Sequence, residues 1–159
     1  YMLAMLSDRR RIVGVDYDAE KIETARHSFL RRPETEFVHA DLRTAELPEA
    51  DAFLLLDVLH YMQPEEQRGL IERCAARLKA GGRIIIRDGD AGKAERHKTK
   101  AMTEVWSTKI VGFNKTDGEL HFTSTPELQQ TARRLGLEIH AAHTDAHTSN
   151  TVYILTRPE

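Results

Sequence analysis

Three short apolar runs, each ending in an aspartate, constrain the fold of this chain most. The runs are Arg11-Ile12-Val13-Gly14-Val15-Asp16, Ala52-Phe53-Leu54-Leu55-Leu56-Asp57 and Arg83-Ile84-Ile85-Ile86-Arg87-Asp88. Runs rich in Val, Ile and Leu are typical of parallel strands whose two faces are both buried. Amphipathic segments alternate with them along the chain. This alternation predicts an α/β fold, with a parallel sheet covered on both faces by right-handed crossovers.

The segments between the runs carry helix start and stop signals. Asp18 is placed to cap a helix over Ala19–Leu30, and a further short strand is predicted over residues 36–40. A second helix is predicted from Pro64 to Leu78, because proline favours the first turn of a helix. The pair Gly81-Gly82 is expected to stop that helix.

The last third of the chain predicts a different arrangement. Residues 126–135 are expected to form a helix that Gly136 caps, and residues 137–143 and 151–155 have the pattern of strands. The connection over 144–150 is too short for a helical crossover, so these two strands are expected to form an antiparallel hairpin. The predicted fold class is therefore α/β, with a mostly parallel sheet and an antiparallel hairpin at its end.

Length and composition limit the classes of protein to which the chain can belong. A chain of 159 residues is expected to form a single domain over 1–159, with an inserted lid over 90–122. The formal charge of −2 provides no global positive field for a nucleic-acid backbone. No apolar run approaches the roughly 20 residues that span a bilayer, and the start lacks a basic leader. The single cysteine, Cys74, suits a reducing cytoplasm, so a cytoplasmic protein is predicted.

The residues that end the strands are the first candidates for a site, because ligands bind at the carboxyl ends of parallel strands. Asp16, Asp41, Asp57 and Asp88 occupy such positions. A carboxylate at Asp16 could accept hydrogen bonds from both hydroxyls of a ribose; the alternative role of helix cap is better filled by Asp18. Tyr17 could lie against an adenine ring.

Four segments resemble the class I S-adenosylmethionine-dependent methyltransferases, particularly their small-molecule branch. The segments are Val13-Gly14-Val15-Asp16-Tyr17-Asp18, His39-Ala40-Asp41-Leu42, Asp57-Val58-Leu59-His60-Tyr61-Met62 and Leu78-Lys79-Ala80-Gly81-Gly82-Arg83. The resemblance implies a doubly wound Rossmann-like fold and S-adenosyl-L-methionine as the cofactor. It implies that the first segment binds the cofactor ribose, that the second binds the adenine, and that the third flanks the cofactor's methionine portion and the substrate.

One element of that family is absent from the sequence. No two glycines are separated by a single residue, so the glycine-rich cofactor loop on the preceding strand is missing. We expect roughly 30 or more native residues upstream, the usual size of a strand-helix-strand unit. Loss of that central strand would expose unpaired edges, which raises the hypothesis of a homodimer.

His60 is the best candidate for a catalytic base, because an imidazole titrates near neutral pH and could deprotonate an acceptor hydroxyl. A packing histidine at the start of a helix is the alternative. Tyr61 is predicted to orient the substrate. Asp57 is interpreted as a cofactor-side or loop-organising acid, with Asp88 a weaker candidate for the same role.

The segment 90–122 supplies the only indication of a substrate. Arg96 and Lys98 lie near Trp106 in the sequence, a combination that can bind an anionic group beside an aromatic or acyl body. A solvated helix face is the alternative. No metal is predicted, because His140, His143 and His147 straddle a strand and a polar loop and lack a completing acid or cysteine.

The sequence lacks a nucleophile elbow, a Cys-x-x-Cys pair and a phosphate-binding P-loop. These absences remove the hydrolase, thiol-redox and P-loop kinase classes. The resemblance to class I methyltransferases implies methyl transfer from S-adenosylmethionine to a small-molecule acceptor, and segment 90–122 indicates an anionic aromatic or lipid-like acceptor. A non-catalytic module that keeps the cofactor fold is the alternative. A nicotinamide-dependent oxidoreductase fits less well, because the terminal hairpin and the segment after Asp57 are untypical of that class.

Overall fold

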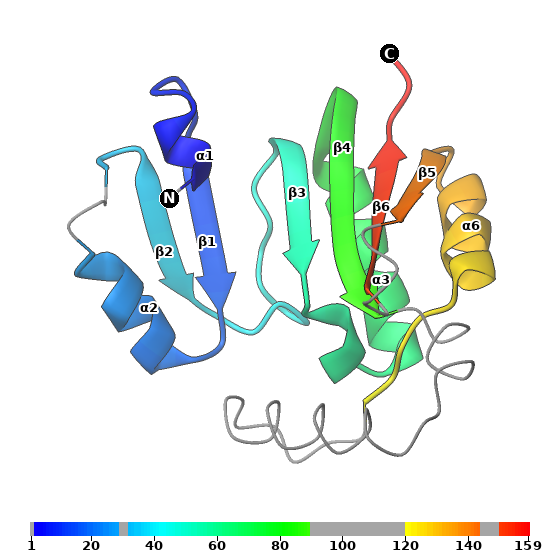
Figure 1. The fold of residues 1–159 in the computed structure, drawn as a ribbon, viewed down its shortest axis with the longest axis horizontal. Helices are drawn as coiled ribbons and strands as arrows, with labels where there is room; N and C mark the ends of the chain where they lie inside the picture. Colours follow the sequence, from blue (N-terminus) through cyan, green and yellow to red (C-terminus); the bar gives the residue numbers. More distant parts are fainter. Residues whose placement is uncertain (1, 29–31, 90–119, 144–149) are drawn as a thin grey trace. The chain divides into compact units, whose positions relative to one another are not determined.

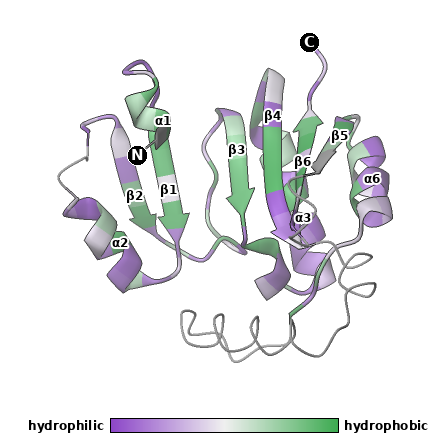
Figure 2. Cartoon of the chain, in the orientation of Figure 1, coloured by the Kyte–Doolittle hydropathy of each residue, from purple (hydrophilic) through white to green (hydrophobic). Residues whose placement is uncertain are grey.

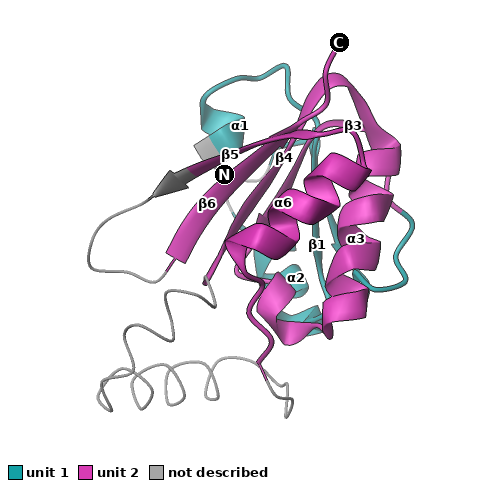
Figure 3. Ribbon diagram, turned by 90° about the vertical axis from the view of Figure 1, so that its right-hand side faces the viewer, with its two compact units in different colours: residues 1–46 teal, residues 47–159 magenta. Residues whose placement is uncertain are grey.

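The computed structural model describes residues 2–28, 32–89, 120–143 and 150–159 (Figure 1). The chain divides into two compact units, residues 1–46 and 47–159 (Figure 3). Residues 90–119 lie outside the described ranges, so the lid predicted over 90–122 stays a prediction, as does the single domain over 1–159.

The first unit is a two-stranded parallel sheet with two helices. Its elements are α1 (Met2–Met5), β1 (Ile12–Asp16), α2 (Ala19–Arg26) and β2 (Thr35–His39). The strands pair in register from Ile12 opposite Thr35 to Asp16 opposite His39. The side chain of Asp18 accepts hydrogen bonds from the backbone N–H groups of Glu20 and Lys21, which confirms it as the cap of α2.

The second unit is a four-stranded mixed sheet. Its strands β3 (Ala50–Leu56), β4 (Leu78–Gly89), β5 (Glu138–His143) and β6 (Asn150–Thr156) lie in the order β3-β4-β6-β5. β3 and β4 are parallel, whereas β6 runs antiparallel to both β4 and β5. The predicted α/β class and terminal hairpin are confirmed, and the second strand of the hairpin lies between the first and the parallel pair.

Three helical elements accompany this sheet: the 3₁₀ turn η1 (Leu59–Tyr61), α3 (Pro64–Arg77) and α6 (Thr125–Arg134). α3 and α6 lie side by side against one face of the sheet (Figure 3). The strands are the most hydrophobic elements of this unit, and β4 turns hydrophilic at its carboxyl end (Figure 2). Alternate residues on the helix-facing side of β4 and β6 are completely buried, namely Ile84, Ile86, Tyr153 and Leu155. This packing fixes the carboxyl end of β4 beside η1.

The glycine pair after α3 differs from its prediction. α3 already ends at Arg77, and β4 begins at Leu78, so Gly81 and Gly82 lie inside a strand. On β3, Ala50 pairs with Leu78 of β4, but Ala52 already pairs with Arg83. The residues of β4 between Leu78 and Arg83 therefore form an irregular bulge. Gly81 has φ +68°, a conformation that favours glycine. The glycines therefore shape a bulge and do not stop the helix.

The end of α6 agrees with its prediction. Gly136 has φ +68°, and the N–H of Leu137 donates to the carbonyl of Ala132 at 2.9 Å, as expected of a glycine-capped helix. Among the described residues, no helix is both long enough and apolar enough to cross a membrane.

Candidate active site

The site in the second unit is built where β3 and β4 end. Because the two strands are parallel neighbours, their carboxyl ends lie at the same edge of the sheet. Asp57 follows β3 directly, and η1 then carries Leu59, His60 and Tyr61. Asp88 lies near the end of β4, on the side that faces the helices. The fold thus brings together side chains 28 residues apart in the sequence.

His60 and Asp88 form a buried hydrogen-bonded pair. His60 is 3% exposed and Asp88 is 5% exposed. His60 Nδ1 lies 2.6 Å from Asp88 Oδ1, and the backbone N–H of His60 donates to Asp88 Oδ2 at 3.2 Å. The N–H of Gly89 donates to Asp88 Oδ1 at 2.7 Å. Both carboxylate oxygens are therefore engaged, and they fix the position of the imidazole.

This pairing selects one tautomer of the imidazole. An ionised carboxylate only accepts hydrogen bonds, so Nδ1 of His60 carries the proton that Asp88 binds. Nε2 is left with its lone pair, and this buried atom has no hydrogen-bond partner in the part of the chain that the structure describes. An oriented imidazole whose second nitrogen is unengaged is the arrangement that a general base requires.

Two aromatic rings contact the imidazole. The centroids of the Tyr61 and His60 rings are 4.1 Å apart, and the angle between the ring planes is 48°. Phe122 is stacked on His60 at 5.4 Å and 28°. The backbone N–H of His121 donates to the carbonyl of His60 at 2.9 Å, so the segment containing Phe122 is attached to η1.

Asp57 holds an unusual backbone conformation at the end of β3. Its φ is +54°, the only positive φ of a described residue other than glycine. Such a conformation costs of order 1 kcal/mol, and two contacts with Arg87 hold it. The Asp57 N–H donates to the Arg87 carbonyl at 2.8 Å, and the two side chains form an ion pair at 2.8 Å.

The surroundings of Asp57 also change its acidity. Burial raises the pKa of its carboxyl, while the charge of Arg87 opposes that increase. The negative charge of Asp88 raises this pKa further. The net effect is a pKa above the ordinary value for aspartate, which is consistent with an acid at the edge of a partly buried site.

The predicted ribose-binding residue, Asp16, ends β1 in the first unit. Asp16 Oδ1 accepts a hydrogen bond from the N–H of Asp18 at 2.9 Å, whereas Oδ2 takes none from the described residues. Tyr17 is 42% exposed, and its carbonyl lies 2.9 Å from Nε2 of His39. An anchored carboxylate with one oxygen unengaged fits a group that presents hydroxyls.

The predicted adenine-binding residue, Asp41, already has a partner. Arg43 contacts both carboxylate oxygens of Asp41, at 2.6–3.0 Å, and its backbone N–H donates to Oδ1 at 2.9 Å. Leu42 lies between these two residues and is half-buried. Asp41 would therefore have to share its carboxylate between Arg43 and an adenine amino group.

Several sequence candidates lie outside the described residues. These include all three predicted substrate-binding residues, Arg96, Lys98 and Trp106, which stay predictions. His147 lies outside as well, and within the described ranges no three metal-ligating side chains cluster together. Cys74 is buried, and burial raises the pKa of its thiol to about 12.

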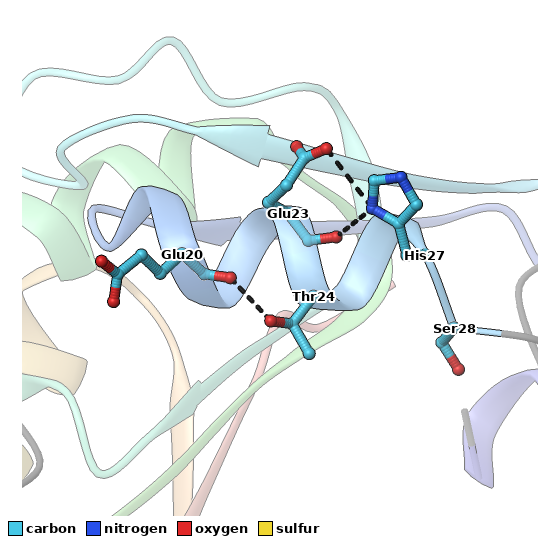
Figure 4. A pocket seen from close by; sticks show the side chains of 5 residues that line it. All are labelled: Glu20, Glu23, Thr24, His27 and Ser28. Carbon is cyan, nitrogen blue, oxygen red and sulfur yellow. Dashed lines mark hydrogen bonds and ion pairs between the residues drawn. The ribbon is translucent and has the colours of Figure 1, made fainter.

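Two hollows on the surface have neither His60 nor Asp88 in their walls. One lies along α2, where Glu20, Glu23, Thr24, His27 and Ser28 line it (Figure 4). The hydroxyl of Thr24 donates to the Glu20 carbonyl, and His27 Nδ1 lies 2.9 Å from the Glu23 carbonyl. The other, of about 560 Å³, lies between α3 and α6 and includes Phe122 in its wall.

The sequence offers His60 as a candidate but does not predict its pairing with Asp88. Asp88 is predicted only as a weaker cofactor-side acid, although it ends a strand as Asp57 does. The deciding information is that β3 and β4 are neighbours and that Asp88 lies on the buried side of β4. Arg83 and Arg87 share one face of this strand by its period of two, and these two charges could have indicated that Asp88 lies on the opposite, apolar face.

The chain matches the model of the O-methyltransferase domain over residues 11–121. It is 32% identical over 78 residues to carboxy-S-adenosyl-L-methionine synthase from Photobacterium profundum, a match covering 47% of this chain and 32% of that protein. The chain therefore spans about a third of the length of the curated relative that it matches.

Solved structures give the same fold. An O-methyltransferase family protein from Burkholderia thailandensis is 28% identical, with a TM-score of 0.59 over 79% of this chain and 36% of that one. Human N-acetylserotonin methyltransferase, solved in complex with S-adenosylmethionine, is 20% identical, with a TM-score of 0.67 over 98% of this chain and 43% of that one. These matches confirm the predicted class I methyltransferase fold. Because the family model covers more than half of its residues, the chain belongs to the O-methyltransferase domain family.

Proposed function

We propose that this protein transfers a methyl group from S-adenosyl-L-methionine to a hydroxyl oxygen of a small molecule, with His60 as the general base. The observation that carries the proposal is the buried pair of His60 and Asp88, in which Nε2 of the imidazole has no hydrogen-bond partner among the described residues. Membership of the O-methyltransferase domain family supports the reaction class. The cofactor supplies an electrophilic methyl group on a sulfonium.

His60 acts on the acceptor in this scheme. Nε2 accepts the hydroxyl proton as the acceptor oxygen forms its bond to the methyl carbon and the bond from that carbon to sulfur breaks. Asp88 stabilises the resulting imidazolium through its bond to Nδ1 and stays ionised. Tyr61 contacts the imidazole and orients the acceptor. Proximity and exclusion of water supply the remainder of the rate enhancement.

The cofactor contacts are proposed from the predicted residues. Asp16 would bind the ribose hydroxyls through the carboxylate oxygen that Asp18 does not engage, and Tyr17 is exposed enough to lie against the adenine. Leu42 and Asp41 would bind the adenine edge, with Arg43 sharing the carboxylate. Asp57, held in its left-handed conformation by Arg87, would flank the methionine portion.

The acceptor is proposed to be anionic and either aromatic or lipid-like, with Arg96, Lys98 and Trp106 as its binding residues. The support for this class of acceptor comes from the sequence. A carboxylate or phosphate would pair with the two cations, while the indole would cover an apolar body.

Calorimetric titration with S-adenosylhomocysteine tests cofactor binding, with the reduced nicotinamide cofactor as the control ligand. We expect saturable binding of S-adenosylhomocysteine alone. Asp16→Asn is expected to weaken binding by about tenfold or more, since it removes charge-assisted hydrogen bonds to the ribose. Asp8→Asn, an exposed change in the same unit, should leave the affinity unaltered. Equal binding of both ligands, or none of either, would contradict the proposal.

Formation of S-adenosylhomocysteine with a phenolic acceptor tests the base. For any such acceptor that the wild type methylates, His60→Gln is expected to lower kcat by about 10²- to 10⁴-fold. Its affinity for S-adenosylhomocysteine should stay the same, because Nε2 faces the acceptor in this scheme. A His60→Gln enzyme with wild-type kcat would exclude His60 as the base and leave proximity as the source of catalysis.

A further inference from the structure

We infer that Gln67 is a positioning residue that holds the imidazole of His60 through residues 121–123. The inference rests on the proposed role of His60 as the base. Gln67 lies in α3, and only 4% of its surface is exposed. An apolar side chain would fill such a buried position at no desolvation cost, so the partners of this amide indicate what it does.

The amide of Gln67 joins two separate segments of the chain. Its Nε2 donates to the carbonyl of Met62 at 2.9 Å and to the carbonyl of His121 at 2.6 Å. Its Oε1 accepts a hydrogen bond from the hydroxyl of Thr123. A primary amide has two N–H donors and a carbonyl acceptor, and the amide of Gln67 makes two contacts as donor and one as acceptor. A fully satisfied buried amide fixes the geometry of its partners.

These partners lie within two residues of His60 or of Phe122, whose rings are stacked. Met62 ends the turn that carries His60, and His121 and Thr123 flank Phe122. The N–H of His121 donates to the carbonyl of His60 and provides a second link between the segments. Gln67 therefore anchors the residues before and after the ring that is stacked on His60.

The result is an imidazole constrained from two directions. Asp88 binds Nδ1, and Phe122 covers one face of the ring at 5.4 Å. Rotation of the ring would break the first contact and lose the second, so Nε2 keeps one direction. Misplacement of a reacting group by a small distance costs a large part of catalysis, which gives this indirect anchoring a functional consequence.

Nuclear magnetic resonance of the 159-residue chain, with labelled histidine, tests the inference without an acceptor. The His60 signals are assigned by their loss in His60→Gln. In Phe122→Leu, the imidazole C–H protons should lose the ring-current shift caused by Phe122. Gln67→Met, which is nearly isosteric and lacks the amide, should lose most of the same shift. Gln129→Met makes the same exchange at an exposed position of α6 and should leave the shift unchanged.

The double variant with Gln67→Met and Phe122→Leu decides whether Gln67 acts through Phe122. If it does, the double variant has the shift of Phe122→Leu alone, because the two changes remove one interaction. Wild-type His60 shifts in folded Gln67→Met, or additive shifts in the double variant, would overturn the inference. If Gln67→Met does not fold, Thr123→Val removes a single contact of the same amide and should lose part of the shift; an unmoved signal would contradict the inference equally.

A parallel titration with S-adenosylhomocysteine separates this inference from the proposed function. Binding to the wild type, together with unmoved His60 signals in Gln67→Met, would overturn the positioning role alone. Moved signals, without any binding to the wild type, would overturn the proposed function and leave the anchoring of His60 by Gln67 supported.

Discussion

At the scale of single residues, the buried carboxylate of Asp88 supports both the site and the stability of the unit around it. It accepts hydrogen bonds from the imidazole and backbone of His60 and from the backbone of Gly89. Asp88→Ala leaves these donors buried without a partner, so we expect the free energy of unfolding to fall by about 2–4 kcal/mol. Urea unfolding followed by circular dichroism measures this loss.

Asp51→Ala is the matched control for that prediction. Asp51 forms an ion pair with Lys79 at 3.2 Å, but its side chain is 85% exposed. Exposed ion pairs contribute little, so no clear change in the urea midpoint is expected. Equal losses in both variants would contradict the burial and bonding of Asp88 that the structure shows.

At the scale of elements, two glycines are expected to respond in opposite ways to replacement by alanine. A Cβ at Gly82 would lie 2.8 Å from the carbonyl oxygen of Lys79 and 2.9 Å from the side chain of Leu78. Gly82→Ala should therefore destabilise the bulge of β4 by about 1–3 kcal/mol. At Gly69, inside α3, a Cβ would meet nothing within 4 Å. Gly69→Ala should stabilise the protein by up to about 1 kcal/mol.

Thermal and urea unfolding of the two alanine variants measures both effects. Opposite signs are expected, although the substitutions are chemically identical and the sites lie 13 positions apart in the chain. Destabilisation at Gly69 would show that α3 is tighter around that residue than the structure has it. A neutral effect at Gly82 would show that the bulge relaxes.

The same elements show which features a sequence alone can predict. β1, β3, α3, α6 and the terminal hairpin follow from local patterns of apolar residues, caps and turn lengths. The role of Gly81-Gly82 does not follow from local patterns, because a bulge is defined by pairing with a distant strand. In the sequence, a glycine pair after a helix fits a helix stop equally well. The apolar runs identify Asp57 and Asp88 as strand ends.

The finer parts of the candidate site depend on contacts between distant segments. The pairing of His60 with Asp88 requires knowing that β3 and β4 are neighbours. In the sequence, Gln67 looks like any polar residue of an amphipathic helix. Its contacts with Met62 and His121 distinguish it from the exposed polar residues of that helix. Arg43 could have been proposed from the sequence as the partner of Asp41, because it lies two residues away. The sequence alone does not tell whether such a pair forms.

At the scale of the whole molecule, the described strands form two sheets of different size and burial. In the first unit, β1 pairs only with β2, and each residue of β1 is half-buried. In the second unit, β4 is flanked by β3 and β6, and it contains completely buried residues such as Ile84 and Ile86. A two-stranded sheet is marginally stable by its own contacts, whereas a strand bonded on both sides opens only with its sheet.

Hydrogen exchange should therefore differ between the units. Backbone amides in 12–16 and 35–39 are expected to exchange faster than those in 83–88 and 151–155, because their openings expose less buried apolar surface. Mass spectrometry of peptic peptides resolves these ranges. Equal protection would mean that the chain opens as one cooperative unit. If S-adenosylhomocysteine binds Asp16, its addition should slow exchange in 12–16, since a ligand of the folded state lowers the population of open forms.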